Sequence, residues 1–154
     1  MDFRIEGLDP DAFQPLFSLD DEALAARGAR RQIADHKPGF PCRVSLEDAE
    51  PGEEVLLLNF EHQPVDSPYR AAGPIYVRRA ATRFSAVNAV PAMLRSRLLS
   101  LRAYDAEGMM VAAEVCEGAA FEPALEALFA DPATAYVHVH NAKPGCFNCR
   151  VERA

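Results

Sequence analysis

The C-terminal segment concentrates the side chains best suited to chemistry. His138 and His140 alternate within AYVHVHN, and two cysteines follow in the spacing H-x-H-x5-C-x2-C. Strand alternation would place both imidazoles on one face, and a turn at residues 144–145 would return the thiols toward them. Two imidazoles and two thiolates are a donor set that suits zinc. The sequence therefore offers a zinc site, with zinc as a candidate cofactor, at His138, His140, Cys146 and Cys149.

Other interpretations of this cluster remain open. If residues 146–149 are extended, the two sulfurs point to opposite faces of a strand and cannot share a metal. The structural alternative is a pair of small buried cysteines with hydrogen-bonded histidines nearby. A redox pair is disfavoured, because a thioredoxin-like site needs a helix after its first cysteine and only five residues follow Cys149.

A second feature is an internal similarity between two turns. KPGFPCRV at 37–44 and KPGCFNCRV at 143–151 share Lys-Pro-Gly, an aromatic residue and Cys-Arg-Val. Each is typical of a type II turn, with Pro at its second position and Gly at the position of positive φ. If the two turns meet, Lys37, Arg43, Lys143 and Arg150 would form a cationic rim around two thiols. The alternative is coincidence between two common turn sequences.

Polar residues also gather around a strand-like run and the loop after it. This loop, at 63–74, is long enough to favour a function, and ligand contacts commonly follow the rigid end of a strand. Guanidinium groups hold carboxylates and phosphates through paired hydrogen bonds. The candidate ligand contacts are Asn59, His62, Ser67, Tyr69, Arg70, Gly73, Arg78 and Arg102. The alternative is that these arginines pair with surface acids.

Familiar catalytic motifs are absent. The chain has no G-x-G-x-x-G, no G-x4-G-K-[ST], no G-x-S-x-G and no H-E-x-x-H, so these nucleotide-binding, hydrolase and zinc-protease motifs give no support. A nucleophile pair of Cys42 or Cys146 with His62 or His140 is conceivable. The sequence does not select it.

Hydrophobic periodicity predicts the elements that must position these residues. Apolar and polar residues alternate or cluster as in strands at 3–8, 30–35, 54–62, 75–79, 98–104, 109–115 and 135–141. Helices are expected at 10–16, 22–28 and 121–129, with one helical turn at 91–97. The DAEG sequence at 105–108 predicts a hairpin. We expect an α+β fold in a single domain, a mostly antiparallel sheet of about six strands with two or three helices packed on it.

Composition excludes several functional classes. The chain has 154 residues, of which 49% are hydrophobic and 25% charged, as in ordinary globular proteins. Its formal net charge of −7 argues against nucleic acid or an anionic membrane as a partner. No apolar run is long enough to span a membrane, and the first residues lack the features of a signal peptide, so a cytoplasmic location is expected.

Four stretches resemble the domain-of-unknown-function family 1203, a family of small bacterial proteins. They are PGFPCRVSLEDAEPGE, HQPVDSPYRAAGPIYVR, LLSLRAYDAEG and HVHNAKPGCFNCRVERA, and together they cover most of the chain. The resemblance implies no settled activity, cofactor or fold.

The leading hypothesis is a polar cleft that binds a small anionic ligand, in a protein that could be an enzyme. Arg43 and Arg70 would clamp the anion, while His62 and His140, with pKa values near the ordinary value of about 6.5, would hydrogen-bond or transfer protons. The first alternative is the zinc module. The second is a non-catalytic interaction domain with an apolar patch around Met109 and Met110 or the helix beginning at Phe121. The sequence does not indicate an oligomeric state.

Overall fold

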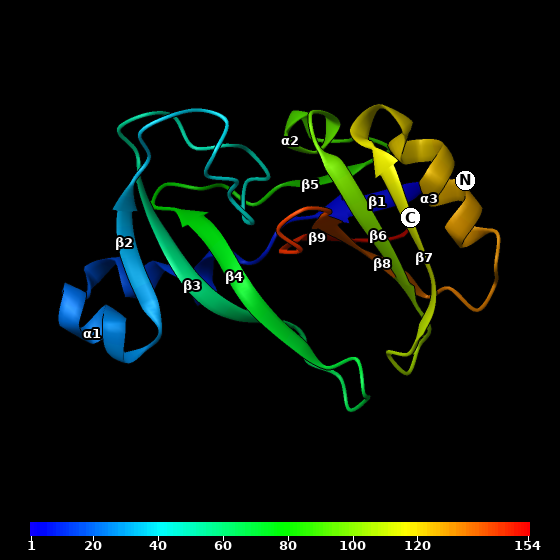
Figure 1. The fold of residues 1–154 in the computed structure, drawn as a ribbon, viewed down its shortest axis with the longest axis horizontal. Coiled ribbons are helices and arrows are strands. Elements are labelled where there is room, and N and C mark those ends of the chain that lie inside the picture. The colour runs from blue at the N-terminus through cyan, green and yellow to red at the C-terminus, as the bar shows by residue number, and fades with distance from the viewer.

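The computed structural model describes all 154 residues, and its largest unit is a six-stranded antiparallel sheet with the order β5-β1-β9-β8-β6-β7 (Figure 1). The β6–β7 and β8–β9 pairs are consecutive in the sequence, whereas β1 pairs with the distant strands β5 and β9. The strands are β1 (Phe3–Glu6), β5 (Ser85–Val87), β6 (Leu98–Tyr104), β7 (Met110–Glu117), β8 (Tyr136–Asn141) and β9 (Phe147–Arg153).

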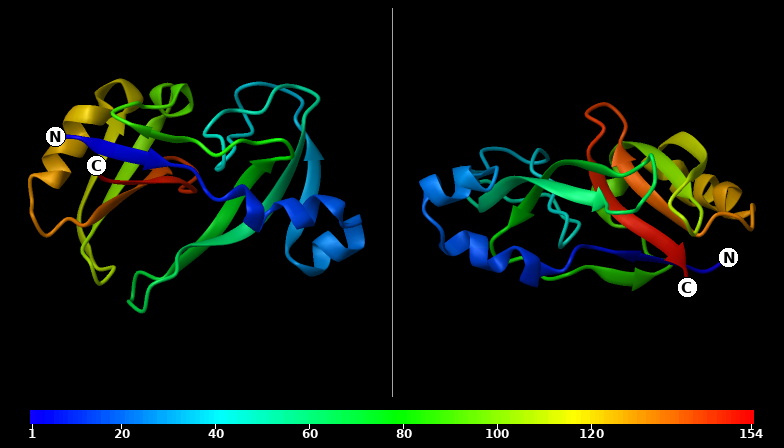
Figure 2. Two further views of the ribbon diagram at one scale, coloured as in Figure 1. Left: turned by 180° about the vertical axis from the view of Figure 1, so that it is seen from behind. Right: turned by 90° about the horizontal axis from the view of Figure 1, so that it is seen from below.

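A second sheet of three antiparallel strands lies beside the first, in the order β2-β3-β4 (Figure 2). Its strands are β2 (Ala29–Ile33), β3 (Glu54–Gln63) and β4 (Ala71–Arg78). The α+β class and a six-stranded antiparallel sheet agree with the sequence prediction. The second sheet corrects it, since hydrophobic periodicity shows that a segment is a strand but not which sheet it joins.

Helices are short and lie outside the sheets (Figure 1). There are three α-helices and three 3-10 helices, more than the two or three helices expected. The segment at 10–16 divides into two 3-10 helices, the expected turn at 91–97 is α2, and η3 was not predicted. They are η1 (Pro10–Ala12), η2 (Gln14–Ser18), α1 (Asp21–Ala26), α2 (Ala92–Arg95), η3 (Gly118–Ala120) and α3 (Phe121–Phe129). No helix is both long and apolar enough to cross a membrane.

Each sheet has its own hydrophobic core. The larger core joins α3, through Phe121 and Leu125, to the alternating apolar residues of the six-stranded sheet, such as Val137 and Val139. The smaller core joins Leu24 of α1 to the apolar face of β3 and β4. Because strand side chains alternate between the two faces of a sheet, each sheet also has a face that is turned away from its core. These two faces contribute the walls of the candidate site.

The chain crosses between the sheets at a close backbone contact. The amide of Gly7 donates to Phe84 O at 2.9 Å, and the amide of Leu8 donates to Arg43 O at 2.8 Å. A Cβ at Gly7 would lie 2.0 Å from Val44 O, so only glycine permits this approach. The crossing brings the connection before β3 next to the six-stranded sheet.

Three local predictions differ from the structure. The loop expected at 63–74 is shorter, because β3 continues to Gln63 through an irregularity in register and β4 begins at Ala71. Two strands, β5 and β9, were not predicted: β5 has only three residues, and the apolar alternation of Phe147, Cys149 and Val151 in β9 was not assigned to a strand. The two Pro-Gly turns also differ: Gly145 has a φ of 80°, whereas the first turn contains a cis peptide bond between Lys37 and Pro38.

Candidate functional site

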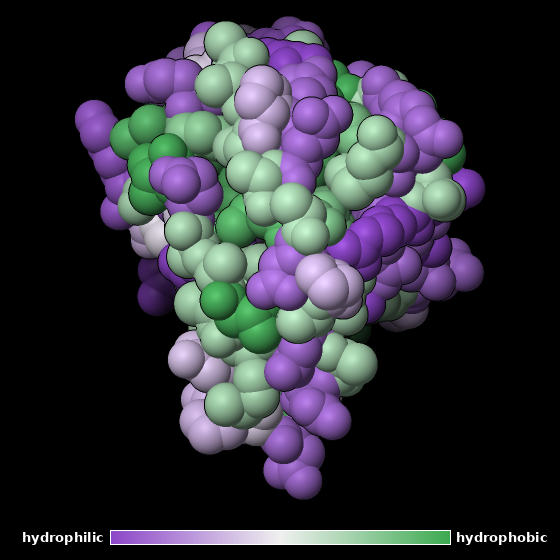
Figure 3. Space-filling model, turned by 90° about the vertical axis from the view of Figure 1, so that its right-hand side faces the viewer, coloured by the Kyte–Doolittle hydropathy of each residue, from purple (hydrophilic) through white to green (hydrophobic).

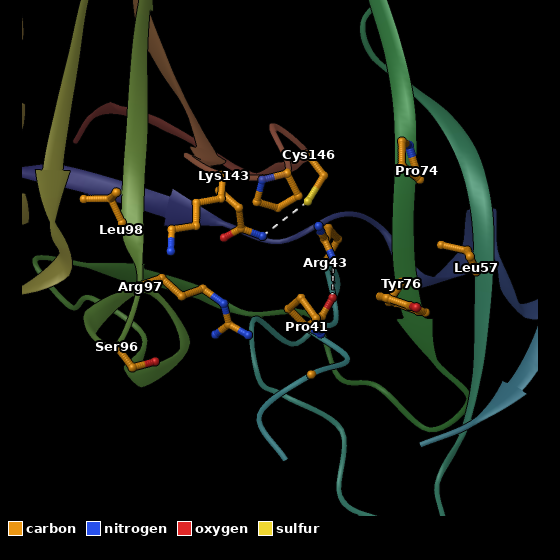
Figure 4. Close-up of a pocket in the computed structure, with 13 residues that line it drawn as sticks. Pro41, Arg43, Leu57, Pro74, Tyr76, Ser96, Arg97, Leu98, Lys143 and Cys146 are labelled. Atoms are coloured by element: carbon orange, nitrogen blue, oxygen red, sulfur yellow. Dashed lines mark hydrogen bonds between the residues drawn. The ribbon is translucent and has the colours of Figure 1, made fainter. Parts of the chain in front are cut away.

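A cavity of about 640 Å³ opens between the two sheets, and we call it the inter-sheet cleft (Figure 4). Its volume is in the range of small-molecule sites. The lining residues come from both sheets and from the two Pro-Gly turns. They are Gly39, Pro41, Arg43, Leu57, Pro74, Tyr76, Ser96, Arg97, Leu98, Asn141, Lys143, Pro144 and Cys146.

Strand alternation explains the apolar part of this lining. In β3, Leu56 and Leu58 belong to the smaller core, so Leu57 faces the opposite way, into the cleft. In β4, Ile75 and Val77 are core residues for the same reason, and Pro74 and Tyr76 line the cleft. The three-stranded sheet therefore supplies an apolar wall.

The two similar turns meet at the opposite end of the cleft. Arg43, from the first turn, donates from Nε to Phe147 O at 2.6 Å, directly after the second turn. Its Nη1 donates to Pro41 O at 2.5 Å. The meeting that the sequence left open thus occurs, and it places Arg43 beside Cys146 (Figure 4).

Arg43 is a cation in an unusual position. Its residue is only 1% exposed, and no carboxylate lies within ion-pair distance of it. Burial lowers the pKa of Arg43, and the interaction with Cys146 partly opposes this effect. A buried guanidinium is normally balanced by an anion as well as by hydrogen bonds, so the site has an uncompensated positive charge.

Two further cations line the cleft, and no Asp or Glu does. Arg97 forms a two-point ion pair with Asp48, with distances of 2.6 and 2.9 Å. Lys143 forms no ion pair and is exposed at the rim. In a chain with a net charge of −7, this cavity is a local region of positive charge.

A smaller cavity of about 230 Å³ adjoins the inter-sheet cleft, and we call it the histidine cavity. The two cavities share Pro74, Pro144 and Cys146. The lining residues of the histidine cavity are His62, Ala71, Ala72, Gly73, Pro74, Arg102, His140, Pro144, Gly145, Cys146 and Phe147.

Three histidines surround Phe147 at this place. The ring centroids of His62 and His140 are 5.1 Å apart, and those of His62 and His138 are 6.0 Å apart. His62 stacks on Phe147 at 5.1 Å, whereas His138 and His140 meet the same ring edge to face. His140 donates from Nδ1 to Gly145 O at 2.9 Å, which leaves Nε2 with its lone pair.

Each of these histidines has one buried ring nitrogen without a hydrogen-bond partner. The atoms are Nδ1 of His62, Nδ1 of His138 and Nε2 of His140. A buried polar atom normally finds a partner, so an orphaned one needs an explanation. Because His62 and His140 line a cavity, a bound molecule could supply the missing donors to these two residues.

The pKa values of these histidines differ from the sequence-based expectation. Burial lowers the pKa of His140 to about 4, and the pKa of His62 is lowered by burial and by the charge of Arg102. Burial, then the like charges of the other two imidazoles, lowers the pKa of His138 to about 3. The expectation of ordinary values near 6.5 is wrong, because the sequence did not show that the rings are buried together.

The structure does not bring the expected zinc ligands together. Cys149 belongs to the larger core and is paired in register with Val139. Val139 alternates with His138 and His140 along β8, so Cys149 lies on the opposite face of the sheet from both imidazoles. No group of three or more His, Cys, Asp or Glu side chains is arranged to hold a metal ion.

Several predicted ligand contacts lie outside both cavities, because acidic residues from other segments pair with them. Lys37 pairs with Glu50, and Arg70 forms a two-point pair with Glu61 at 3.0 and 3.1 Å. Arg78 is held by Glu53 and Glu47. The structure therefore does not place Arg70 beside Arg43, and Lys143 is the cation without an acidic partner that lines the inter-sheet cleft together with Arg43.

The other predicted contacts divide between the cavity and the surface. Arg102 lines the histidine cavity and pairs with no acid. Asn59 is exposed on β3, and Tyr69 is exposed with its ring 6.2 Å from that of Tyr104. Arg150 stacks on Tyr136 instead of joining the rim. Neither Asn59 nor Tyr69 lines a cavity.

Sequence reasoning missed several residues of the cleft. Arg97 was assigned only to a helical turn, although its position between α2 and β6 is a loop of the kind that carries function. Asn141 was not singled out. Its side chain donates to Cys146 Sγ at 3.3 Å and accepts from Asn148 at 2.9 Å. Only the folded β8–β9 hairpin brings these groups together.

The apolar patch expected of an interaction domain is partly present. Phe121 is fully buried, so the helix it begins offers no such patch. Exposed apolar residues instead follow the edge strand β7 and its neighbours, and hydrophilic residues are mixed with them on this side of the molecule (Figure 3). They are Leu98, Met109, Val111 and Val115.

Comparison with known proteins identifies a family whose description states no activity. A family model described as a protein of unknown function (DUF1203) matches residues 39–153. No curated protein and no solved structure matches the chain. The matched region contains every residue of the inter-sheet cleft and of the histidine cavity.

Proposed function

Since the chain belongs to the DUF1203 family, whose description states no activity, we propose from the site itself that the protein binds a small organic anion in the inter-sheet cleft. The observation that carries the proposal is the charge of the lining: Arg43, Arg97 and Lys143 line the cavity and no carboxylate does. Of these three cations, only Arg97 has an acidic partner.

The three cations differ in what they would contribute. Arg43 is buried and held in place by two carbonyl oxygens, so it would supply a fixed positive charge at the inner end of the cleft. Lys143 is exposed, and its flexible ammonium would approach the anion from the rim. Fixed charges and donors in a partly dry cavity bind an anion better than the same groups on an open surface.

The remaining lining favours an organic ligand over a bare inorganic ion. Leu57 and Tyr76 form an apolar wall on the side of the three-stranded sheet, and Leu98 adds an apolar group beside Arg97 and Lys143 (Figure 4). A cavity of about 640 Å³ is much larger than phosphate alone needs, and ligand sites typically combine apolar walls with a few polar groups. A carboxylate or phosphate ester with an apolar or aromatic part fits this lining.

The adjoining histidine cavity would add neutral polar groups. Because their pKa values are lowered, His62 and His140 are uncharged at neutral pH and act as hydrogen-bond acceptors or as bases. Arg102 lies with them and has no acidic partner. A ligand that extends from the inter-sheet cleft past Cys146 would meet these groups.

The proposal can be tested by thermal unfolding with matched ligand pairs. We expect benzoate and phenyl phosphate to raise the Tm, whereas benzyl alcohol, their neutral counterpart, does not. At a ligand concentration of about 100 times Kd, the stabilisation is about 2.7 kcal/mol, which is a shift of roughly 5 to 10 °C for a chain of this size.

The two lysines of the chain provide a matched pair of variants. Lys143→Ala should weaken the anion-dependent shift, while Lys37→Ala, which removes a lysine paired with Glu50 outside the inter-sheet cleft, should leave it unchanged. Equal shifts with anionic and neutral ligands, or equal responses of the two variants, would refute the proposal.

A further inference from the structure

We propose that Cys146 is a nucleophile that forms a covalent bond with an electrophilic carbon of the bound organic anion. This inference rests on the proposed anion site and adds a reacting residue to it. All four cysteines are free, but only Cys146 lines either cavity, and it lines both. The sulfur is therefore placed where the charged cleft meets the histidine cavity.

The groups around the sulfur suit a reactive thiol. The Arg43 guanidinium lies beside it, and the Asn141 amide donates to Sγ at 3.3 Å. Asn148, which is fully buried, fixes the orientation of that amide through a bond of 2.9 Å. Protein thiols that react as nucleophiles sit in such electropositive, partly exposed places.

An acceptor for the thiol proton is present in the same cavity. His140 is 0% exposed, and its Nδ1 is committed to Gly145 O. Its Nε2 is therefore the basic nitrogen, and because this atom has no hydrogen-bond partner, it does not bond directly to Cys146 Sγ. A nucleophile with a neighbouring base that a third group orients is the general arrangement of covalent catalysis. The Gly145 carbonyl is the orienting group here.

The proposed step balances as follows. The proton of the Cys146 thiol passes to Nε2 of His140 through a water molecule held in the histidine cavity. A lone pair of Sγ forms a bond to the electrophilic carbon of the ligand. The bond from that carbon to the leaving group breaks, and the leaving group takes the electron pair. The His140 imidazolium then gives its proton to the leaving group, or to water when the leaving group is iodide. Lys143 and the fixed charge of Arg43 hold the anionic end of the ligand during this step.

The other cysteines provide internal controls. Cys116 is partly exposed like Cys146, but it lies on the edge strand β7, where burial and then Glu114 and Glu117 raise its pKa. Cys149 is fully buried, and its pKa is raised to about 12. Cys149 should stay unmodified in any variant that is folded.

The experiment measures alkylation of each cysteine in the intact protein by peptide mass spectrometry. Iodoacetamide is the neutral probe and iodoacetate the anionic one. We expect iodoacetamide to modify Cys146 at least about tenfold faster than it modifies free glutathione at the same pH, as for an activated thiol. Cys116 should react more slowly than both. We expect the ratio of iodoacetate to iodoacetamide rates at Cys146 to exceed that at Cys116 by a similar factor, and Lys143→Gln to reduce that ratio.

The outcomes separate this inference from the proposed function. If iodoacetamide modifies Cys146 no faster than it modifies glutathione, the nucleophile is refuted, whatever iodoacetate shows. If Cys146 is fast but shows no preference for iodoacetate, the anion site fails instead.

The base is tested by His140→Asn, which should slow alkylation of Cys146 by at least about tenfold and leave Cys116 unchanged. An unchanged Cys146 rate in a variant whose Cys149 stays protected would overturn the role of His140. If Cys149 becomes reactive, the variant is unfolded, and the comparison of Cys146 in the wild-type protein with glutathione decides.

Discussion

Acidification should destabilise this protein through the buried histidines, and the size of the effect follows from their environment. His138 and His140 are 1% and 0% exposed, with pKa values lowered to about 3 and about 4. In the unfolded chain both have the ordinary value of about 6.5. Between pH 6.5 and pH 4 the unfolded state therefore binds more protons than the folded state, so stability falls as the pH falls through this window.

The size of this loss of stability is set mainly by protonation of the two histidines in the unfolded state. At pH 5 both histidines are neutral in the folded protein, whereas both are protonated in the unfolded chain. Protonation of each histidine stabilises the unfolded state by 2.303RT for each pH unit below 6.5. Relative to neutral pH, this loss is about 2 kcal/mol for each histidine and about 4 kcal/mol for the two together. A typical domain has a total stability of about 5 to 15 kcal/mol, so the loss is a large fraction of it.

Urea unfolding at pH 7 and pH 5 measures this loss, and a variant isolates one histidine. The free energy of unfolding of His138→Asn should fall by about 2 kcal/mol less between the two pH values than that of the wild-type protein. Carboxylate contributions cancel in this comparison because both proteins share them. If His138→Asn and the wild-type protein lose equal stability, within about 0.5 kcal/mol, the assignment of a buried neutral His138 is wrong.

Two further predictions concern stability. Gly7→Ala places a Cβ 2.0 Å from Val44 O and should lower the free energy of unfolding by more than about 2 kcal/mol. Gly73→Ala meets no atom within 4 Å and should lower it by less than about 1 kcal/mol. Equal losses for the two variants in urea unfolding would refute the close contact at Gly7. Arg97→Ala leaves the nearly buried Asp48 carboxylate unpaired and should cost about 3 kcal/mol, and adding Asp48→Ala should restore part of this loss. A double variant that loses the sum of the single losses would show that the pair is not coupled.

Local sequence information was sufficient for much of the secondary structure. The helix at Phe121–Phe129 agrees with its prediction residue for residue, because its apolar spacing follows the helical period. The hairpin of β6 and β7 forms around the DAEG turn, where Gly108 has a φ of 80°. Asp20 caps α1 through a bond to the Ala23 amide at 2.8 Å. Each of these signals lies within a few neighbouring residues.

The pairing of distant strands could not be predicted from local sequence. β5 has three residues, and its pairing with β1 joins segments about eighty residues apart. β9 alternates apolar and polar residues, but a register irregularity opposite β8 places Phe147 beside His140 and Cys149 beside Val139, on opposite faces of the sheet. The choice of sheet depends on which partner buries a strand, and that partner is remote in the sequence.

The sequence by itself determined which side chains have chemical capacity: the paired histidines of β8, the cysteine and arginine that end each Pro-Gly turn, and the surplus of arginine over lysine. It did not determine which of them keep that capacity. Lys37, Arg70 and Arg78 are neutralised by glutamates, whereas Arg43 and Lys143 are not. Only the tertiary structure decided this, because ion pairing and burial depend on which groups lie within a few ångströms in space, and in this chain remote segments place them there.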